Sequence, residues 1–156
     1  MSGRETFYLE LIKPSHYDDN GYVIQWWRAS IPSNSLSALY GLAFDAAERR
    51  VLGADVDLQI TPYDESNTIL PIRAIIRRFR RNPMRGLVCL VGVQSSQFPR
   101  GLDILRQFRA AGVPVAIGGF HVSGCIAMLP EPPPDLRAAL DLGATLVAGE
   151  AEGRLE

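Results

Sequence analysis

The sequence predicts a doubly wound α/β domain, in which five parallel strands alternate with helices on both faces of the sheet. Three observations predict this class. Short apolar runs alternate with stretches of helical periodicity along the chain. The connections between them have the length that crossovers between parallel strands need. Residues 87–93 are apolar throughout, which is typical of a central parallel strand covered on both faces.

The chain has the composition of one globular domain. It has 156 residues, of which 47% are hydrophobic and 21% charged, so it can bury a core of ordinary size. The net charge of −1 gives no overall attraction to nucleic acid or to an anionic membrane. The sequence has no signal segment and no apolar run of about 18 residues. We therefore expect a cytoplasmic protein that does not span a membrane.

The first expected strand covers residues 6–13, although Glu10 makes it a poor candidate for burial on both faces. A long connection, residues 14–33, follows it. Connections longer than about 12–15 residues are commonly lids, binding loops or disordered. The aromatic side chains of this one, which include Trp26 and Trp27, argue against disorder. We expect the loop to pack on the domain, with a hairpin turn at Asn20-Gly21.

The next elements are a helix, a strand and a second helix. Asn34 or Ser35 can cap the first helix, and Gly53 ends it. Residues 56–61 alternate between apolar and polar, which indicates a strand with one face in water, as at the edge of a sheet. The second helix begins at Pro71 and separates apolar residues from arginines. The arginines are Arg73, Arg77, Arg78, Arg80 and Arg81. They are a solvated helix face or a phosphate-binding surface, and we favour the solvated face.

The second half of the chain continues the alternation. A third helix begins at Pro99 and ends at Gly112, and the apolar run from residue 115 that stops at Gly118 and Gly119 is the fourth strand. Residues 136–140 suggest a short fourth helix, and residues 145–148 the fifth strand. A wet second strand and an apolar third strand fit the flavodoxin-like strand order 2-1-3-4-5.

This strand order predicts one ligand site at the carboxyl ends of the strands. Ligands of open α/β sheets collect there, where the strand order reverses. The loop at residues 14–33, the polar residues 94–97 and the Gly118-Gly119 pair are therefore expected around one crevice. Paired glycines either allow the backbone to approach something large and flat or simply turn the chain.

Few other residues carry a chemical signal. His16 and His121 are expected in loops at this rim, where a lone histidine is more often a hydrogen-bonding or surface residue than a ligand. The sequence has no zinc-ligand spacing, no phosphate-binding glycine motif and no evident Ser-His-Asp arrangement. Two cysteines are too few for a disulfide framework or an iron-sulfur cluster. Glu150 and Glu152 are an acid-base pair or a connector, and we favour the connector.

Three short motifs follow the last three expected strands. They read Val-Gln-Ser-Ser-Gln-Phe-Pro at residues 93–99, Gly-Gly-Phe-His-Val-Ser at 118–123 and Gly-Glu-Ala-Glu-Gly at 149–153. In this order they resemble the amino-terminal cobalamin-binding domain of cobalamin-dependent radical S-adenosylmethionine proteins. The resemblance covers residues 13–153.

The resemblance implies that a corrin ring lies across the carboxyl ends of the strands, with its nucleotide tail beside the sheet. The cofactor-binding residues that it implies are Gln94, Ser95, Ser96, Gly118, Gly119, His121, Ser123, Gly149 and Glu150. Ser95 and Ser96 would bind the tail or the corrin amides, and His121 and Ser123 would meet the edge of the ring. Trp26 and Trp27 would cap the ring or belong to the core. The resemblance implies no metal ligand and no catalytic residue in this chain.

The chain departs from the family pattern in two places. The signature Asp-x-His-x-x-Gly, whose histidine ligates cobalt, is missing, since residues 15–21 read Ser-His-Tyr-Asp-Asp-Asn-Gly. The Cys-x-x-x-Cys-x-x-Cys motif of the radical domain is absent too. We therefore expect residues 1–156 to be a single, non-catalytic cobalamin-binding domain that binds weakly alone, with residues 155–156 as a cloning remnant. A catalytic domain in cis would hold S-adenosylmethionine and the iron-sulfur cluster.

Two alternatives stay open. A flavin- or nucleotide-binding flavodoxin-like protein would carry a different chromophore or none. A degenerate domain would keep the fold for docking without a cofactor, and exposed aromatic surface on residues 17–27 would favour it.

Overall fold

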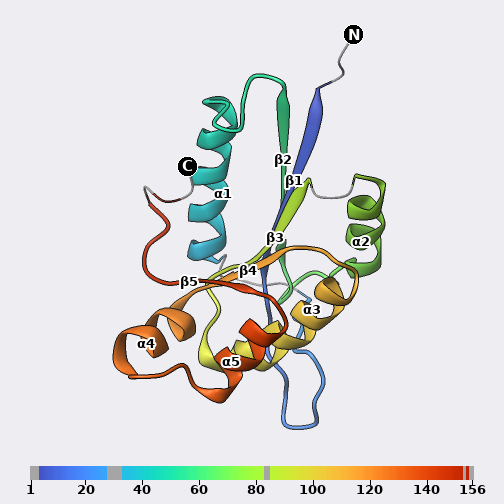
Figure 1. Ribbon diagram of the computed structural model, residues 1–156. Coiled ribbons are helices and arrows are strands. Elements are labelled where there is room, and N and C mark those ends of the chain that lie inside the picture. Colours follow the sequence, from blue (N-terminus) through green and yellow to red (C-terminus); the bar gives the residue numbers. More distant parts are fainter. Residues whose placement is uncertain (1–3, 28–32, 83–84, 153, 155–156) are drawn as a thin grey trace.

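Five parallel strands form one sheet in the computed structural model, in the order β2-β1-β3-β4-β5 (Figure 1). The strands are β1 (Glu5–Lys13), β2 (Val56–Asp64), β3 (Gly86–Leu90), β4 (Val115–Gly118) and β5 (Thr145–Val147). The structure describes residues 4–27, 33–82, 85–152 and 154. Every neighbouring pair of these strands is parallel. The predicted fold class and strand order are therefore confirmed.

Helices cover both faces of the sheet, as predicted. They are α1 (Asn34–Glu48), α2 (Ile72–Arg81), α3 (Phe98–Ala110), α4 (Phe120–Met128) and α5 (Pro134–Asp141), with one turn of 3-10 helix, η1 (Ser95–Gln97). α1 packs on one face, where Leu36 joins Leu9 and Leu11 in a small core. α2, α3 and α5 pack on the other face around the larger core, which includes Ile12. Side chains of β1 alternate between these faces.

Two predicted boundaries at the carboxyl end of β3 and the start of α1 are corrected. The third strand ends at Leu90 rather than at residue 93, because Gly92 turns the chain with φ 58°. A Cβ on Gly92 would lie 2.7 Å from the Ser35 Cβ, so the first turn of α1 packs against this turn. The helix cap is Ser33 rather than Asn34 or Ser35, since the Ser33 hydroxyl accepts a hydrogen bond from the Leu36 amide.

α4 is a helix where the sequence predicted only a glycine loop. Its N-cap is Gly119, which offers no side chain to the first free amides. Val122 is its one buried residue, whereas Phe120 and Met128 are exposed. Without a capping side chain or an apolar stripe the segment carries no helix signal, so His121 lies in the first turn of a helix and not in a loop.

The described part of the long loop, residues 14–27, folds back on itself as a hairpin. Tyr17 and Val23 form an antiparallel bridge, and Asn20-Gly21 makes the turn, with Gly21 at φ 83°. The Asp18 carboxylate accepts hydrogen bonds from the Asn20 and Tyr22 amides across this turn. The predicted hairpin is confirmed, and residues 28–32 of the predicted loop lie outside the described residues.

A buried ion pair fastens this loop to the sheet and to α3. Glu65, just after β2, is 1% exposed. Its carboxylate accepts hydrogen bonds from Arg100 Nη2 (2.6 Å) and Arg100 Nε (3.0 Å) of α3, and from the Ser15 amide (3.0 Å) at the start of the loop. Tyr17 donates to Asp103 of α3 at 2.5 Å. The loop is thus fixed at both the sheet and the helix.

Arg100→Met tests this anchor. It leaves the buried Glu65 carboxylate without its cation, and breaking one side of a buried pair costs about 3–5 kcal/mol of unfolding free energy. Urea unfolding measures the loss. The control is Arg137→Met, which removes an exposed ion pair to Glu131 and costs about 0–1 kcal/mol. Equal losses in both variants would contradict the anchoring role.

Glu10 is a buried acid in the middle of β1. Its side chain is 0% exposed, and Arg78 Nη2 of α2 lies 3.2 Å from Glu10 Oε1. Neither carboxylate oxygen makes a hydrogen bond of good geometry within the described residues. Burial raises the pKa of Glu10, and the nearby Arg78 charge opposes this shift only in part. Folding therefore favours the protonated acid.

The raised pKa makes stability depend on pH. The protonated form stabilises the fold below the ordinary pKa of 4.5, and this contribution is lost as the pH rises through the higher pKa of the folded state. Glu10→Gln removes the titration. We expect the urea midpoint of the wild type to fall relative to that of Glu10→Gln as the pH rises above 4.5. Parallel curves for the two proteins would rule out a raised pKa.

Candidate functional site

The candidate site lies beyond the carboxyl ends of β3, β4 and β5, where the three motifs meet (Figure 1). Ser95 Oγ lies 2.9 Å from His121 Nδ1, which joins the first motif to the second. The Gly149 amide donates to Ser123 Oγ at 3.0 Å, which joins the second motif to the third. Segments more than 20 residues apart in the sequence thus form one continuous edge.

The fold requires a glycine at position 119, whether or not a ligand binds. It adopts φ 139°, a region open almost only to glycine, and a Cβ there would lie 2.1 Å from the Val93 amide nitrogen. Val93 donates to the Gly118 carbonyl (3.0 Å), and the His121 amide donates back to the Val93 carbonyl (3.1 Å). The close approach that the glycine pair suggested is therefore to residues 92–93 of this chain, so the pair alone does not indicate a ligand.

His121 is held at both ring nitrogens. Nε2 lies 2.7 Å from Asp135 Oδ2 of α5, Nδ1 lies next to Ser95, and the ring packs on Phe98 at 4.6 Å between centroids. When His121 carries its proton on Nε2, that nitrogen donates a hydrogen bond to Asp135, and Nδ1 accepts a hydrogen bond from the Ser95 hydroxyl. The fold thus assembles a Ser-His-Asp series that the sequence did not reveal, and the hydrogen-bonding reading of His121 fits its contacts.

This series polarises the Ser95 hydroxyl but does not by itself define a hydrolase. Nucleophilic serine sites also need a place for the substrate beside the hydroxyl. Two hollows of the described surface lie away from Ser95, one between α2 and β1 and the other between α1 and β2. Ser95 itself stands on an exposed surface, which suits a broad ligand better than a small ester.

Lys13 connects the ends of β1 and β3 behind the exposed serines. Its Nζ donates to the Gly92 carbonyl (2.5 Å) and to Gln97 Oε1 (2.9 Å), and Gln97 Oε1 also accepts from the Gln94 amide (3.0 Å). Burial lowers the pKa of Lys13, and Asp64 opposes the shift. These bonds fix the loop after β3. Gln94, Ser95 and Ser96 remain exposed on it.

The described part of the long aromatic loop, residues 14–27, does not join this site. Its Tyr17 binds α3, and the Trp26 amide donates to the Ser66 carbonyl after β2 at 2.6 Å. Within the described residues, no hydrogen bond or ring contact links residues 14–27 to residues 118–123. Trp27 is 95% exposed and Trp26 63%, so the core role considered for them is wrong. The predicted convergence therefore holds for residues 94–97 and the Gly118-Gly119 pair and is not seen for residues 14–27.

Sequence reasoning missed two contributors to the site. Asp135 orients His121 from α5, a contact that tertiary packing alone creates. Phe120 stands directly after the glycine pair and is 77% exposed, and Met128, at the other end of α4, is exposed as well. Its position inside the Gly-Gly-Phe-His motif is the sequence feature that could have identified Phe120 as a site residue. Glu150 is exposed, and Gly153 of the third motif lies outside the described residues.

Other classes of site find little support in the described ranges. They contain no group of three His, Cys, Asp or Glu side chains that could hold a metal ion. None of the helices there has the length and apolar character to cross a bilayer. Comparison of the chain with protein-family models, with curated proteins and with solved structures finds no match.

Substitutions at two glycines, Gly119 and Gly124, test the close crossing of Gly119 over residues 92–93. Gly119→Ala places a Cβ against the Val93 backbone and forces a glycine-only conformation, so we expect a loss of about 3 kcal/mol or more in urea unfolding. Gly124→Ala, within α4, meets no atom within 4 Å and is expected to stabilise by about 0.5–1 kcal/mol. A tolerated Gly119→Ala would contradict the close crossing.

Proposed function

We propose that this chain is a cobalamin-binding domain, with the corrin held over the carboxyl ends of β3, β4 and β5. One observation carries the proposal. The three motifs that resemble cobalamin-binding domains lie together in space, through the Ser95–His121 contact and the Ser123–Gly149 hydrogen bond. Motif residues that merely terminated strands would not need side-chain contacts with one another.

The chemistry of the surface fits this ligand. Cobalamin is a broad, flat macrocycle with amide groups at its rim, and the edge offers the exposed Phe120 ring as an apolar platform. Gln94 and Ser96 are exposed, and they would donate to or accept from the amides. On α4, a Cβ on Gly124 would meet open space. Both nitrogens of His121 already have partners, which agrees with the missing cobalt-ligand signature.

Bound cobalamin would supply a cobalt centre able to carry a methyl group or an electron. The residues of this chain would bind and orient the cofactor, with Ser95 positioned by His121 and Asp135. The chemistry itself would belong to a catalytic domain in cis that holds S-adenosylmethionine and an iron-sulfur cluster. Such a domain would also cover the exposed face of the corrin.

A docking domain without cofactor is the second candidate, because the aromatic loop is exposed as that alternative requires. Tyr22, Trp26 and Trp27 are all more than half exposed. Side chains of this kind are enriched at protein interfaces. A flavin or nucleotide at the end of β1 is less well supported, since Lys13 and Ser35 already pack around Gly92 there.

The test is a visible-absorption titration with hydroxocobalamin, with bound and free cofactor separated by gel filtration. We expect saturable binding at ~1–100 μM, or roughly 5–8 kcal/mol, and a base-off spectrum with the nucleotide tail beside the sheet. No histidine ligand should replace the base, because both nitrogens of His121 already have partners. Phe120→Ala should weaken binding by about tenfold, whereas Met128→Ala, at the other end of the same helix, should not.

Two outcomes would count against the cofactor. Failure of the cofactor to comigrate even at ~millimolar concentration would favour the docking domain. Equal effects of Phe120→Ala and Met128→Ala would mean that the corrin does not lie at the start of α4. Sedimentation of the wild type and of Trp27→Ala then tests docking, because self-association that depends on Trp27 is the signature of an aromatic interface.

A further inference from the structure

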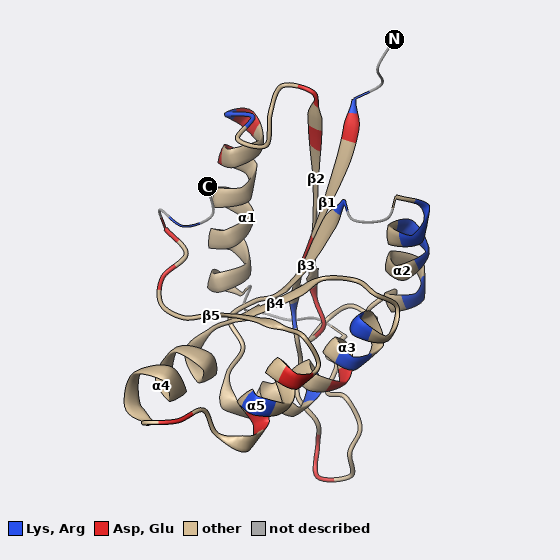
Figure 2. Cartoon of the chain, viewed as in Figure 1, with Lys and Arg blue, Asp and Glu red and all other residues tan. Residues whose placement is uncertain are grey.

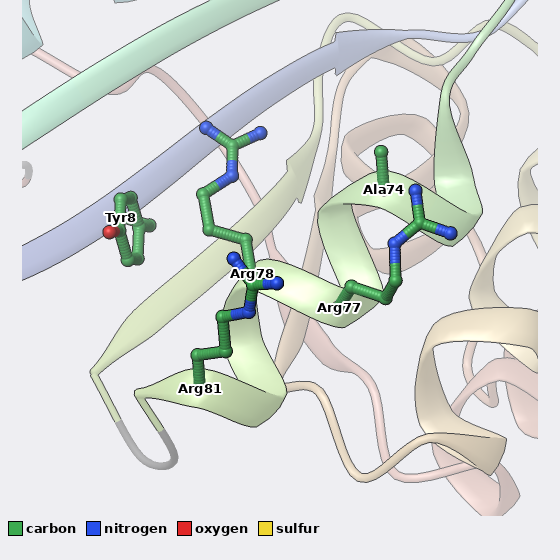
Figure 3. Close-up of a pocket in the computed structure, with 5 residues that line it drawn as sticks. All are labelled: Tyr8, Ala74, Arg77, Arg78 and Arg81. Atoms are coloured by element: carbon green, nitrogen blue, oxygen red, sulfur yellow. The ribbon is translucent and has the colours of Figure 1, made fainter.

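A basic hollow lies between α2 and β1, well away from the candidate cobalamin site. It has a volume of about 430 Å³ and is lined by Tyr8, Ala74, Arg77, Arg78 and Arg81 (Figure 3). Tyr8 is the register partner of Gly86, the first residue of β3. The hollow therefore belongs to the amino-terminal half of the sheet, opposite the edge that carries the three motifs.

The charge around this hollow is one-sided. Lys and Arg residues dominate α2 (Figure 2), and the helix places three guanidinium groups around the same depression. Arg77 and Arg81 are exposed, and in the described part of the chain neither makes an ion pair with an acid. Arg78 is paired with Glu10, so Arg77 and Arg81 carry the uncompensated charge. Holding these two like charges close together costs free energy that a bound anion would recover.

Arg78 forms the fixed side of the hollow. Figure 3 shows it reaching from α2 toward β1, with Tyr8 on the strand beside it. Its guanidinium lies 5.3 Å from the centre of the Tyr8 ring, 3.2 Å from Glu10 Oε1 and 3.5 Å from the Tyr63 hydroxyl. The ring and the two oxygens restrict its rotamers. A guanidinium that is oriented before binding loses less entropy when an anion arrives.

Two simpler explanations cover only part of these observations. Basic residues in the last turn complement the helix dipole, and Arg78, Arg80 and Arg81 lie in that turn. That effect does not account for Arg77 or for the hollow. A purely solvated face, which the sequence favoured, does not account for the packing of Arg78 on Tyr8.

We propose that this hollow binds the phosphate or pyrophosphate group of a small phosphorylated molecule. Guanidinium groups match phosphate oxygens in planar, bidentate geometry. The concave shape and the aromatic wall suit a small ligand, whereas the net charge of −1 gives no general attraction to a nucleic acid. The proposal does not depend on cobalamin binding.

Calorimetric titration of the full chain with sodium pyrophosphate tests the site. We expect one saturable site. Arg77→Gln and Arg81→Gln should each weaken it by roughly tenfold or more, because each removes a charged hydrogen-bond donor to the phosphate. Both residues are exposed, so circular dichroism should show that the variants fold.

Arg80→Gln is the matched control, since Arg80 is exposed on the same turn of α2 but does not line the hollow. It should leave affinity within about twofold if binding is local. Equal weakening by all three substitutions would overturn the proposal in favour of general attraction to the helix. Absence of saturable binding at ~millimolar pyrophosphate would also overturn it. So would tighter binding of a single-stranded oligonucleotide with equal losses in all variants, which would indicate an extended polyanion surface.

Discussion

The close crossing of Gly119 over residues 92–93 is the constraint on which the candidate site depends. It continues the contact between β3 and β4 beyond the ends of both strands, through hydrogen bonds of Val93 with the Gly118 carbonyl and the His121 amide. The same crossing starts α4. His121 then meets Ser95 on one side, and Ser123 meets the end of β5 on the other. A bulkier residue at 119 would separate all three motifs.

The two buried acids, Glu65 and Glu10, differ in how well their negative charges are compensated. Glu65 has a bidentate arginine and a backbone amide, so its charge is matched and it fixes the long loop. Glu10, on the α2 face of β1, has one guanidinium at 3.2 Å and no well-formed hydrogen bond. Burial of the ionised carboxylate therefore costs more free energy at Glu10 than at Glu65.

Some of the most exposed apolar side chains of the described residues lie at two places that the core does not use. One is the start of α4, where Phe120 is exposed beside the motif residues. The other is the tip of the aromatic loop at Trp26 and Trp27. Apolar patches of this kind mark sites for a ligand or a partner. A flat cofactor on the first and a protein partner on the second are compatible, because no described contact joins the two regions.

The sequence by itself determined the fold class, the strand order and the positions of the motifs at the strand ends, because alternation in β2 and continuous apolar character in β3 are local patterns that burial imposes directly. Only the tertiary structure decided which polar groups meet. Asp135 reaches His121 from another helix, Gly119 serves a crossing with its own chain, and Trp26 and Trp27 stay outside the core. These outcomes depend on distances between segments far apart in the chain, and periodicity along one segment carries no information about them.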